Sequence, residues 1–301
     1  MAVVMGAVIF VFNLLNNTSV IDAIYTLASY TYGPILGLFA FGIFTKKQVY
    51  DKYIRNILHN SYYTTRSKIM KTTINCFLPF SQLEETVQTV KELRASTLVD
   101  KIYLLASPIT NVCIPGCELI SVEKMQSTQA MRAIAEHSDK AYTLLYTKQT
   151  ALQIGMFALE RMVQVMEMTQ AAMVYADHYQ QIDGVQKTAP VIDYQPGSLR
   201  DDFNFGSVLL FNANAFKEVI ENTEEEYQYA GLYDLRLKIS QKSKLVHINE
   251  YLYTEVESDK RKSGEKQFDY VDPKNRQVQI EMEQACTNHL KEIGGYLYPI
   301  F

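Results

Sequence analysis

The chain has 301 residues, 48% of them hydrophobic and 21% charged, with a formal net charge of −4 at pH 7. The charges are unevenly distributed along the chain. Asp22 is the only charged side chain in residues 1–44, and residues 45–71 contain seven cationic side chains and one anionic side chain. The remaining residues carry a net charge of −9. An acidic domain argues against a general nucleic-acid binder, which would show a basic footprint. Four scattered cysteines exclude a disulfide framework, and Cys113 and Cys117 lack the second Cys or His pair of a zinc site.

Residues 1–44 are predicted to embed in a membrane. The run from Val20 to Phe44 is long enough to cross a bilayer, which needs roughly twenty apolar residues, whereas the run from Met1 to Leu15 is short for a span. No Lys or Arg precedes the first run, so we expect no signal peptide. The basic cluster after Phe44 predicts that the following residues face the cytoplasm. We therefore expect one or two transmembrane helices, a basic linker over residues 45–69, and a cytoplasmic domain over residues 70–301.

Strands and helices are then predicted to alternate along the chain. Apolar or β-rich runs predict strands at 72–80, 101–106, 117–122, 141–146 and 172–175. Helical spacing predicts helices at 83–93, with Leu83, Val87, Val90 and Leu93 on one face, and at 156–168, with buried methionines. Ser127 is the expected N-cap of a helix that ends at His137. This alternation indicates an α/β fold with a mainly parallel sheet flanked by helices.

The second half is less regular. We expect strands at 205–211 and 246–254, and helices at 215–221, 232–240 and 278–293, the last of them ended by Gly294 and Gly295. A polar stretch over residues 255–277 contains the basic run Lys260-Arg261-Lys262. No glycine-rich phosphate-binding loop is present, so the sequence does not favour a kinase or a dehydrogenase.

Four segments of this domain carry a resemblance to a known family: TTINCFLPFSQLEET (72–86), STQAMRAIAEHSDKAYTLLYT (127–147), FNFGSVLLFNANAF (203–216) and YQYAGLYDLRLKIS (227–240). Their order and spacing resemble the GT-A fold of family 2 glycosyltransferases, most of all glycosyltransferase-like proteins of the Bacteroidetes type. The resemblance implies a nucleotide-diphospho-sugar donor, a glycan or lipid-linked acceptor, and a role in cell-surface polysaccharide synthesis.

The sequence departs from that family at three positions. Tyr146-Thr147-Lys148 stands where the family has the D-x-D motif that holds a divalent cation. Gly231-Leu232 stands where the acidic pair with the catalytic base begins a helix, and Ala106-Ser107 replaces a uracil-contacting aspartate. We therefore expect no cofactor, although Mg²⁺ or Mn²⁺ is left open despite the missing ligand motif.

The family resemblance and these three departures suggest candidate site residues. Lys148, helped by Arg261, is expected to meet the diphosphate charge in place of a metal, because charge-assisted contacts to phosphate are strong. The candidate bases are Asp234 and the Asp201-Asp202 pair, of which we favour Asp202. The resemblance further implies substrate contacts from Pro79, Phe80, Ser107, Arg132, Asp177 and His178. A surface role for Lys148 and a strand-end turn at Tyr175–His178 remain the simpler readings of those residues.

Two interpretations of the domain stay open. It is either a metal-independent glycosyltransferase or a non-catalytic transferase-like module that accompanies an active transferase domain.

A second resemblance concerns the N-terminal segment. A late transmembrane helix of bacterial sodium:solute symporters is similar to residues 19–53, SVIDAIYTLASYTYGPILGLFAFGIFTKKQVYDKY. That match covers about fifty residues, whereas transport sites form between repeats of several helices, so we do not expect transport. The expected location is the bacterial inner membrane.

Overall fold

The computed structural model describes residues 74–80, 82–110, 112–182, 184–257 and 276–298. The chain divides into two compact units, Met1–Thr64 and Thr65–Phe301, and every described residue belongs to the second unit. The predicted membrane segment and basic linker lie outside the described residues and stay predictions. Within the described part, no helix has both the length and the apolar character needed to cross a bilayer.

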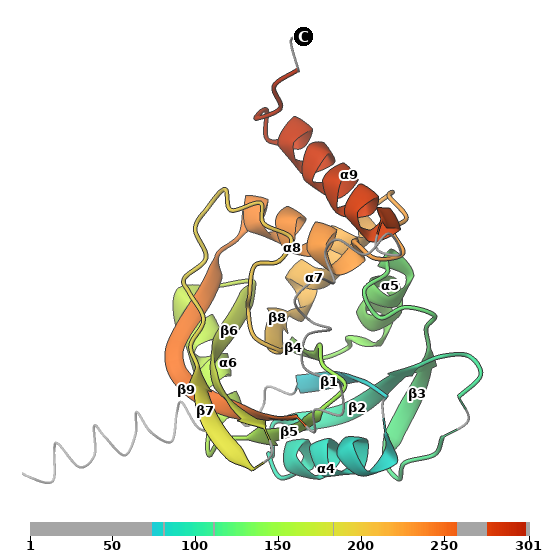
Figure 1. The fold of residues 1–301 in the computed structure, drawn as a ribbon, viewed down its shortest axis with the longest axis vertical. Helices are drawn as coiled ribbons and strands as arrows, with labels where there is room; N and C mark the ends of the chain where they lie inside the picture. Colours follow the sequence, from blue (N-terminus) through green and yellow to red (C-terminus); the bar gives the residue numbers. More distant parts are fainter. Residues whose placement is uncertain (1–73, 81, 111, 183, 258–275, 299–301) are drawn as a thin grey trace, which may run out of the picture. The chain divides into compact units, whose positions relative to one another are not determined.

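The described strands form one nine-stranded sheet (Figure 1) in the order β3-β2-β1-β4-β8-β6-β9-β5, with β7 paired to β6. Its parallel half contains β1 (Ile74–Pro79), β2 (Val99–Ala106), β3 (Cys117–Ser121) and β4 (Tyr142–Tyr146). Strand β8 (Val208–Asn212) runs antiparallel between β4 and β6 (Met173–Ile182), and β9 (Leu245–Glu257) runs parallel to β6. The short strand β5 (Ala151–Ile154) pairs antiparallel with β9, and β7 (Val185–Ala189) pairs antiparallel with β6. The predicted mainly parallel sheet is confirmed.

Helices cover both faces of the sheet. Helices α4 (Leu83–Arg94) and α6 (Ala158–Thr169) pack on one face, where their apolar residues join one buried cluster with alternate residues of β1 and β4. Helices α5 (Thr128–His137), α7 (Ala213–Glu221) and α8 (Gly231–Lys242) cover the other face and share the second cluster. Because β1 and β4 are buried on both faces, they need apolar side chains at almost every position.

Most predicted elements are confirmed, with corrections in detail. Ser127 caps α5, and its Oγ accepts from the Ala130 N–H at 3.1 Å. In α4 the predicted face is partly wrong, because Leu83 and Val87 are exposed while Thr86 and Thr89 are buried. The threonines tolerate burial because each hydroxyl donates to a backbone carbonyl one turn earlier. Strands β5 and β7 were not predicted.

Helix α9 (Arg276–Glu292) packs against α8, as Figure 1 shows. Ala285 of α9 is buried with Tyr233 and Leu237 of α8. The Glu281 carboxylate accepts from the Tyr229 N–H at 2.7 Å, directly before α8 begins. An anionic side chain at this point stabilises the amino-terminal end of a helix. The glycine stop is confirmed, since Gly294 has φ +72°, a conformation that glycine adopts without steric cost.

The contact between α9 and α8 is expected to weaken in acid. Burial lowers the pKa of His289, and the Gln241 side-chain amide lies 2.9 Å from its Nδ1. As the pH falls below about 6.5, the unfolded chain takes up a proton that the folded chain resists, so stability falls with pH. Urea denaturation at pH 7.5 and 5.5 should show a smaller acid loss in His289→Gln than in the wild type. Equal losses in the two proteins would exclude His289 as a source.

Candidate functional site

The first candidate site is a hollow of about 550 Å³ at the carboxyl ends of β1, β2 and β3. Pro79 and Phe80 line it from the end of β1, Ser107 from the end of β2, and Gln149 from the turn after β4. Ligands of open α/β sheets bind outside the carboxyl ends of the strands. The structure thus brings together three of the predicted substrate contacts, Pro79, Phe80 and Ser107, and their role stays a prediction.

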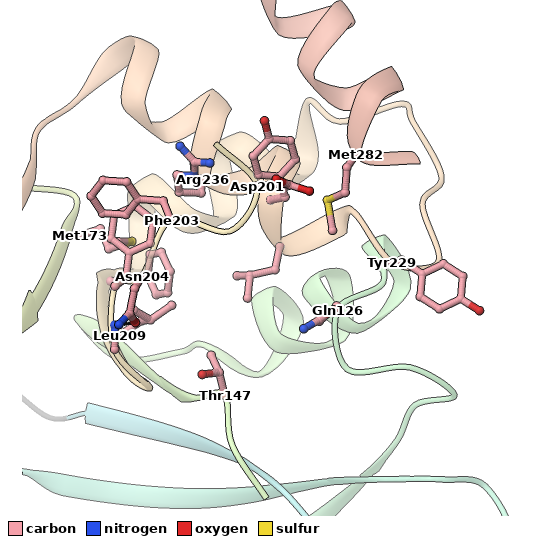
Figure 2. Close-up of a pocket in the computed structure, with 15 residues that line it drawn as sticks. Gln126, Thr147, Met173, Asp201, Phe203, Asn204, Leu209, Tyr229, Arg236 and Met282 are labelled. Atoms are coloured by element: carbon pink, nitrogen blue, oxygen red, sulfur yellow. Dashed lines mark hydrogen bonds between the residues drawn. The ribbon is translucent and has the colours of Figure 1, made fainter. Parts of the chain in front are cut away.

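A second cavity, of about 200 Å³, lies on the α5 and α8 side of the sheet (Figure 2). Its wall includes Thr147 after β4, Leu209 of β8, Leu232 of α8 and the loop from Asp201 to Gly206. Met282 of α9 also reaches this wall. Since Thr147 borders this cavity and Gln149 borders the hollow, the tip of β4 separates the two spaces.

Lys148 at this tip is held by a buried carboxylate. Its Nζ lies 2.5 Å from Glu255 Oε2, and the other oxygen of Glu255 lies 3.3 Å from His178 Nε2. The Glu255 side chain is 1% exposed and that of Lys148 36%. The Tyr253 ring stacks on His178, and its hydroxyl accepts from the Ser207 N–H at 2.8 Å. Lys148 is at the predicted place, but its charge is balanced by Glu255 and it lines neither cavity.

The tip of β4 does not fit a divalent cation. Thr147 donates its hydroxyl to the Ser207 carbonyl, and Lys148 presents an ammonium where hard oxygen ligands would be needed. Among the described residues, no group of three or more His, Cys, Asp or Glu side chains has an arrangement suited to a metal ion. The residues present therefore give no basis for a step that passes through a metal at this tip.

Asp177 lies within β6, so the simpler reading of a strand-end turn there is wrong. Its Oδ1 accepts from the Val191 N–H at 2.8 Å and lies 2.9 Å from His247 Nε2. The other ring nitrogen of His247 lies 2.7 Å from Asp193 Oδ1. Both ring nitrogens of His247 therefore face carboxylate oxygens. This Asp177–His247–Asp193 chain fastens the segment after β7 to the sheet, and none of its three residues lines either cavity.

Of the other predicted site residues, Asp234, Asp202 and Arg132 line neither the hollow nor the second cavity; Arg132 borders a separate pocket between α5 and α7. Asp234 is buried in α8, 2.9 Å from Lys238, and burial raises the pKa of its carboxyl. Asp202 is exposed, and hydrogen bonds from Arg200 at 2.8 Å lower its pKa. Arg132 on α5 donates to the Thr223 carbonyl at 3.0 Å. Arg261 lies outside the described residues.

Of the predicted Asp201-Asp202 pair, Asp201 is the residue that borders the second cavity. It lines the second cavity from the loop before β8, whereas its neighbour Asp202 does not (Figure 2). The sequence showed two adjacent aspartates, but a loop has no regular periodicity from which to predict which of the two side chains faces a cavity. The path of the loop backbone determines it.

Comparisons with known proteins give limited similarity. No family model matches the chain, and no curated protein matches it significantly. Among solved structures, the fold is similar to a crystal structure of GalNAc-T7 with UDP, GalNAc and Mn²⁺ (TM-score 0.46, 11% identity, 62% of this chain and 44% of that chain). It is also similar to the crystal structure of S. aureus TarS residues 1–349 (TM-score 0.47, 8% identity, 61% of this chain and 60% of that chain). The chain spans less than two thirds of the length of either structure.

Proposed function

We propose that this chain transfers a sugar from a nucleotide-diphospho-sugar to a glycan or lipid-linked acceptor. The observation that carries the proposal is the hollow of about 550 Å³ at the carboxyl ends of β1–β3, next to a second, aromatic-lined cavity. A two-substrate reaction needs two adjoining spaces, and the tip of β4 stands between them. The family resemblance of the four sequence segments agrees with this use of the sheet edge.

In this proposal the hollow takes the nucleotide and the second cavity takes the acceptor. Phe80 offers an aromatic surface for a base, and the polar groups of Ser107 and Gln149 face the same space. Lys148 carries an ammonium at this tip, and its positive charge would favour a diphosphate that reaches the tip. A carboxylate that fixes the ammonium in place preorganises it for that contact.

The test is calorimetric titration of the full chain with UDP, GDP, UDP-glucose and UDP-N-acetylglucosamine, in Mn²⁺ and in EDTA. We expect at least one nucleotide to bind in EDTA. Ser107→Phe should fill the hollow and weaken binding at least tenfold, whereas Thr188→Phe, an exposed position on β7, should not change it. Absence of binding to every nucleotide, or equal binding by both variants, contradicts the proposal.

One observation favours the alternative, a non-catalytic transferase-like module. The ammonium of Lys148 is already paired with the buried Glu255, so the tip of β4 carries little net charge. A module that binds a glycan or a partner domain without turnover needs no charge at that position. Glycan binding without release of UDP from any nucleotide sugar would favour the module over the enzyme.

A further inference from the structure

The turn between β5 and α6 exposes two large apolar side chains. Met156 is 87% exposed and Phe157 is 70% exposed, and the two are adjacent in the chain. The next two residues, Ala158 and Leu159, are buried in the cluster on the α4 and α6 face of the sheet. A single exposed apolar residue needs no explanation, whereas two adjacent large ones at one turn suggest a surface that is covered in use. We call this pair the Met156-Phe157 tip.

The backbone holds the tip in a conformation that is costly for the isolated domain. Phe157 has φ +58°, in the left-handed region that bulky residues rarely adopt. It occupies the N-cap position of α6, yet it supplies no side-chain hydrogen bond there, as Ser, Thr, Asp or Asn would. Strain of this kind persists where the surrounding structure imposes it, and it concentrates at functional positions.

Backbone hydrogen bonds fix the turn. The Gly155 N–H donates to the Leu252 carbonyl of β9 at 2.8 Å, and the Ala158 N–H donates to the Gly155 carbonyl at 3.1 Å. A Cβ on Gly155 would lie 2.6 Å from the Leu252 oxygen, so the turn packs directly on β9. The two apolar side chains are therefore presented by a fixed backbone.

The charges beside the tip are balanced. Arg161, in the first turn of α6, donates from Nε and Nη2 to the Glu250 carboxylate at 3.0 and 2.6 Å. Glu160 is the acidic residue of the same turn. Together Glu160, Arg161 and Glu250 carry no net positive charge, so an anionic partner would gain nothing from them. Apolar contact has to supply the binding energy at this tip.

A lipid bilayer fits this tip better than a protein does. Stable protein interfaces bury about 1,200 Å² or more of total surface with complementary shapes, which two side chains do not provide. A bilayer accepts apolar side chains without such matching, and a weak apolar contact suffices when a second anchor is present. The sequence predicts that second anchor in residues 20–44. Residues 45–73, even fully extended, would keep Ile74 within about 100 Å of it, which raises the effective concentration of the tip at the bilayer.

We propose that the Met156-Phe157 tip inserts into the surface of the bilayer in which residues 20–44 are predicted to embed. This docking does not depend on sugar transfer. Helix α4 begins at the hollow, where Gln82 and Glu85 line the wall, and α6 also begins at the carboxyl edge of the sheet, since it leads back to the start of β6. Insertion of the tip therefore turns this edge of the sheet toward the membrane surface.

Tryptophan fluorescence tests the insertion, because the chain contains no tryptophan. Phe157→Trp, Met168→Trp and Ile192→Trp each place one reporter at an exposed apolar position: on the tip, at the far end of α6, and in the segment after β7. The full chain is reconstituted into phosphatidylcholine vesicles with or without brominated acyl chains. Bromine should quench more than half of the emission of Phe157→Trp and leave that of the two controls nearly unchanged, since α6 separates Met168 from the tip by roughly 16 Å.

Four outcomes contradict the insertion. Equal quenching at Phe157→Trp and at either control, or no quenching at the tip, overturns the proposal. Blue-shifted emission of Phe157→Trp without quenching means that a protein surface covers the tip, which also overturns it. Quenching that requires added phosphatidylglycerol would assign the contact to charge and overturn the apolar tip. Met156→Trp repeats the measurement if Phe157→Trp does not fold.

Phe157→Gly separates docking from stability. Glycine adopts φ +58° without steric cost, so this variant should have a higher urea midpoint than the wild type in detergent micelles. In the Met156→Trp background, the same change should remove at least half of the bromine quenching, because one of the two inserted side chains is gone. A lower urea midpoint would show that the Phe157 ring stabilises the fold, and unchanged quenching would show that the ring does not enter the bilayer. Either result overturns the proposal.

Discussion

Replacing Gly231 by alanine is expected to lower the free energy of unfolding by about 3 kcal/mol or more, because the first turn of α8 lies against the start of α5. A Cβ on Gly231 would stand 2.3 Å from the Thr128 backbone nitrogen and 2.5 Å from the Ser127 carbonyl carbon. Backbone atoms on a capped helix cannot move aside as a flexible side chain can. The usual helical advantage of alanine over glycine, about 1 kcal/mol, does not offset such a clash.

Chemical denaturation measures this change, with Gly295→Ala as the control. A Cβ on Gly295 would meet only side-chain atoms at 3.4 Å or more, so that variant should stay within about 0.5 kcal/mol of the wild type. Equal stability of Gly231→Ala and the wild type would show that α8 can shift away from α5. Gly231 stands where the resembling family has an acidic residue, so we expect Gly231→Glu to be unstable rather than to restore a base.

Replacing Lys148 by methionine is expected to lower the free energy of unfolding by about 2 kcal/mol and to weaken nucleotide binding at least tenfold. The Glu255 carboxylate is 1% exposed and would lose its ammonium partner. Breaking a fully buried pair costs about 3–5 kcal/mol, and the exposure of Lys148 reduces that figure because solvent screens the pair. His178 Nε2 stays 3.3 Å from the other Glu255 oxygen, so the carboxylate keeps one polar neighbour.

A double-mutant cycle separates the two roles of Lys148. Glu255→Gln keeps the ammonium, so nucleotide binding in EDTA should be retained or tightened even where stability falls. The double variant Lys148→Met/Glu255→Gln should recover part of the lost stability, because no unpaired buried charge remains, yet it should still bind nucleotide weakly. If Lys148→Met binds nucleotide as the wild type does, Lys148 is a structural cation and has no part in binding the diphosphate.

The helices and strands were largely readable from the chain because their signals are local. Apolar runs such as Tyr142–Tyr146 mark strands buried on both faces, and Ser127 marks a helix start through its own side chain. The misses had non-local causes. On the buried face of α4, the Thr89 hydroxyl accepts a hydrogen bond from the Leu152 N–H of β5, a residue 63 positions away. Strand β5 has only four residues and takes its shape from pairing with β9.

The candidate site was readable only in part. The family resemblance named Pro79, Phe80 and Ser107, and the structure places them at one hollow because β1 and β2 are parallel and their carboxyl ends meet at one edge. Their role as substrate contacts stays a prediction. Three features could not be predicted from the sequence. They are which of Asp201 and Asp202 borders a cavity, the burial of Asp234, and the ion pair between Lys148 and Glu255. Each depends on a partner distant in the sequence or on the path of an irregular loop.

The sequence by itself determined the alternation of elements, the parallel sheet and the edge of the sheet where substrates are expected, since hydrophobic periodicity and caps act over a few residues. Tertiary structure alone decided which charges face a cavity and which are neutralised inside the fold. Lys148 and Glu255 are 107 positions apart, and Asp177 and His247 are 70 apart. Only the packing of β4, β6 and β9 brings such groups within hydrogen-bond distance.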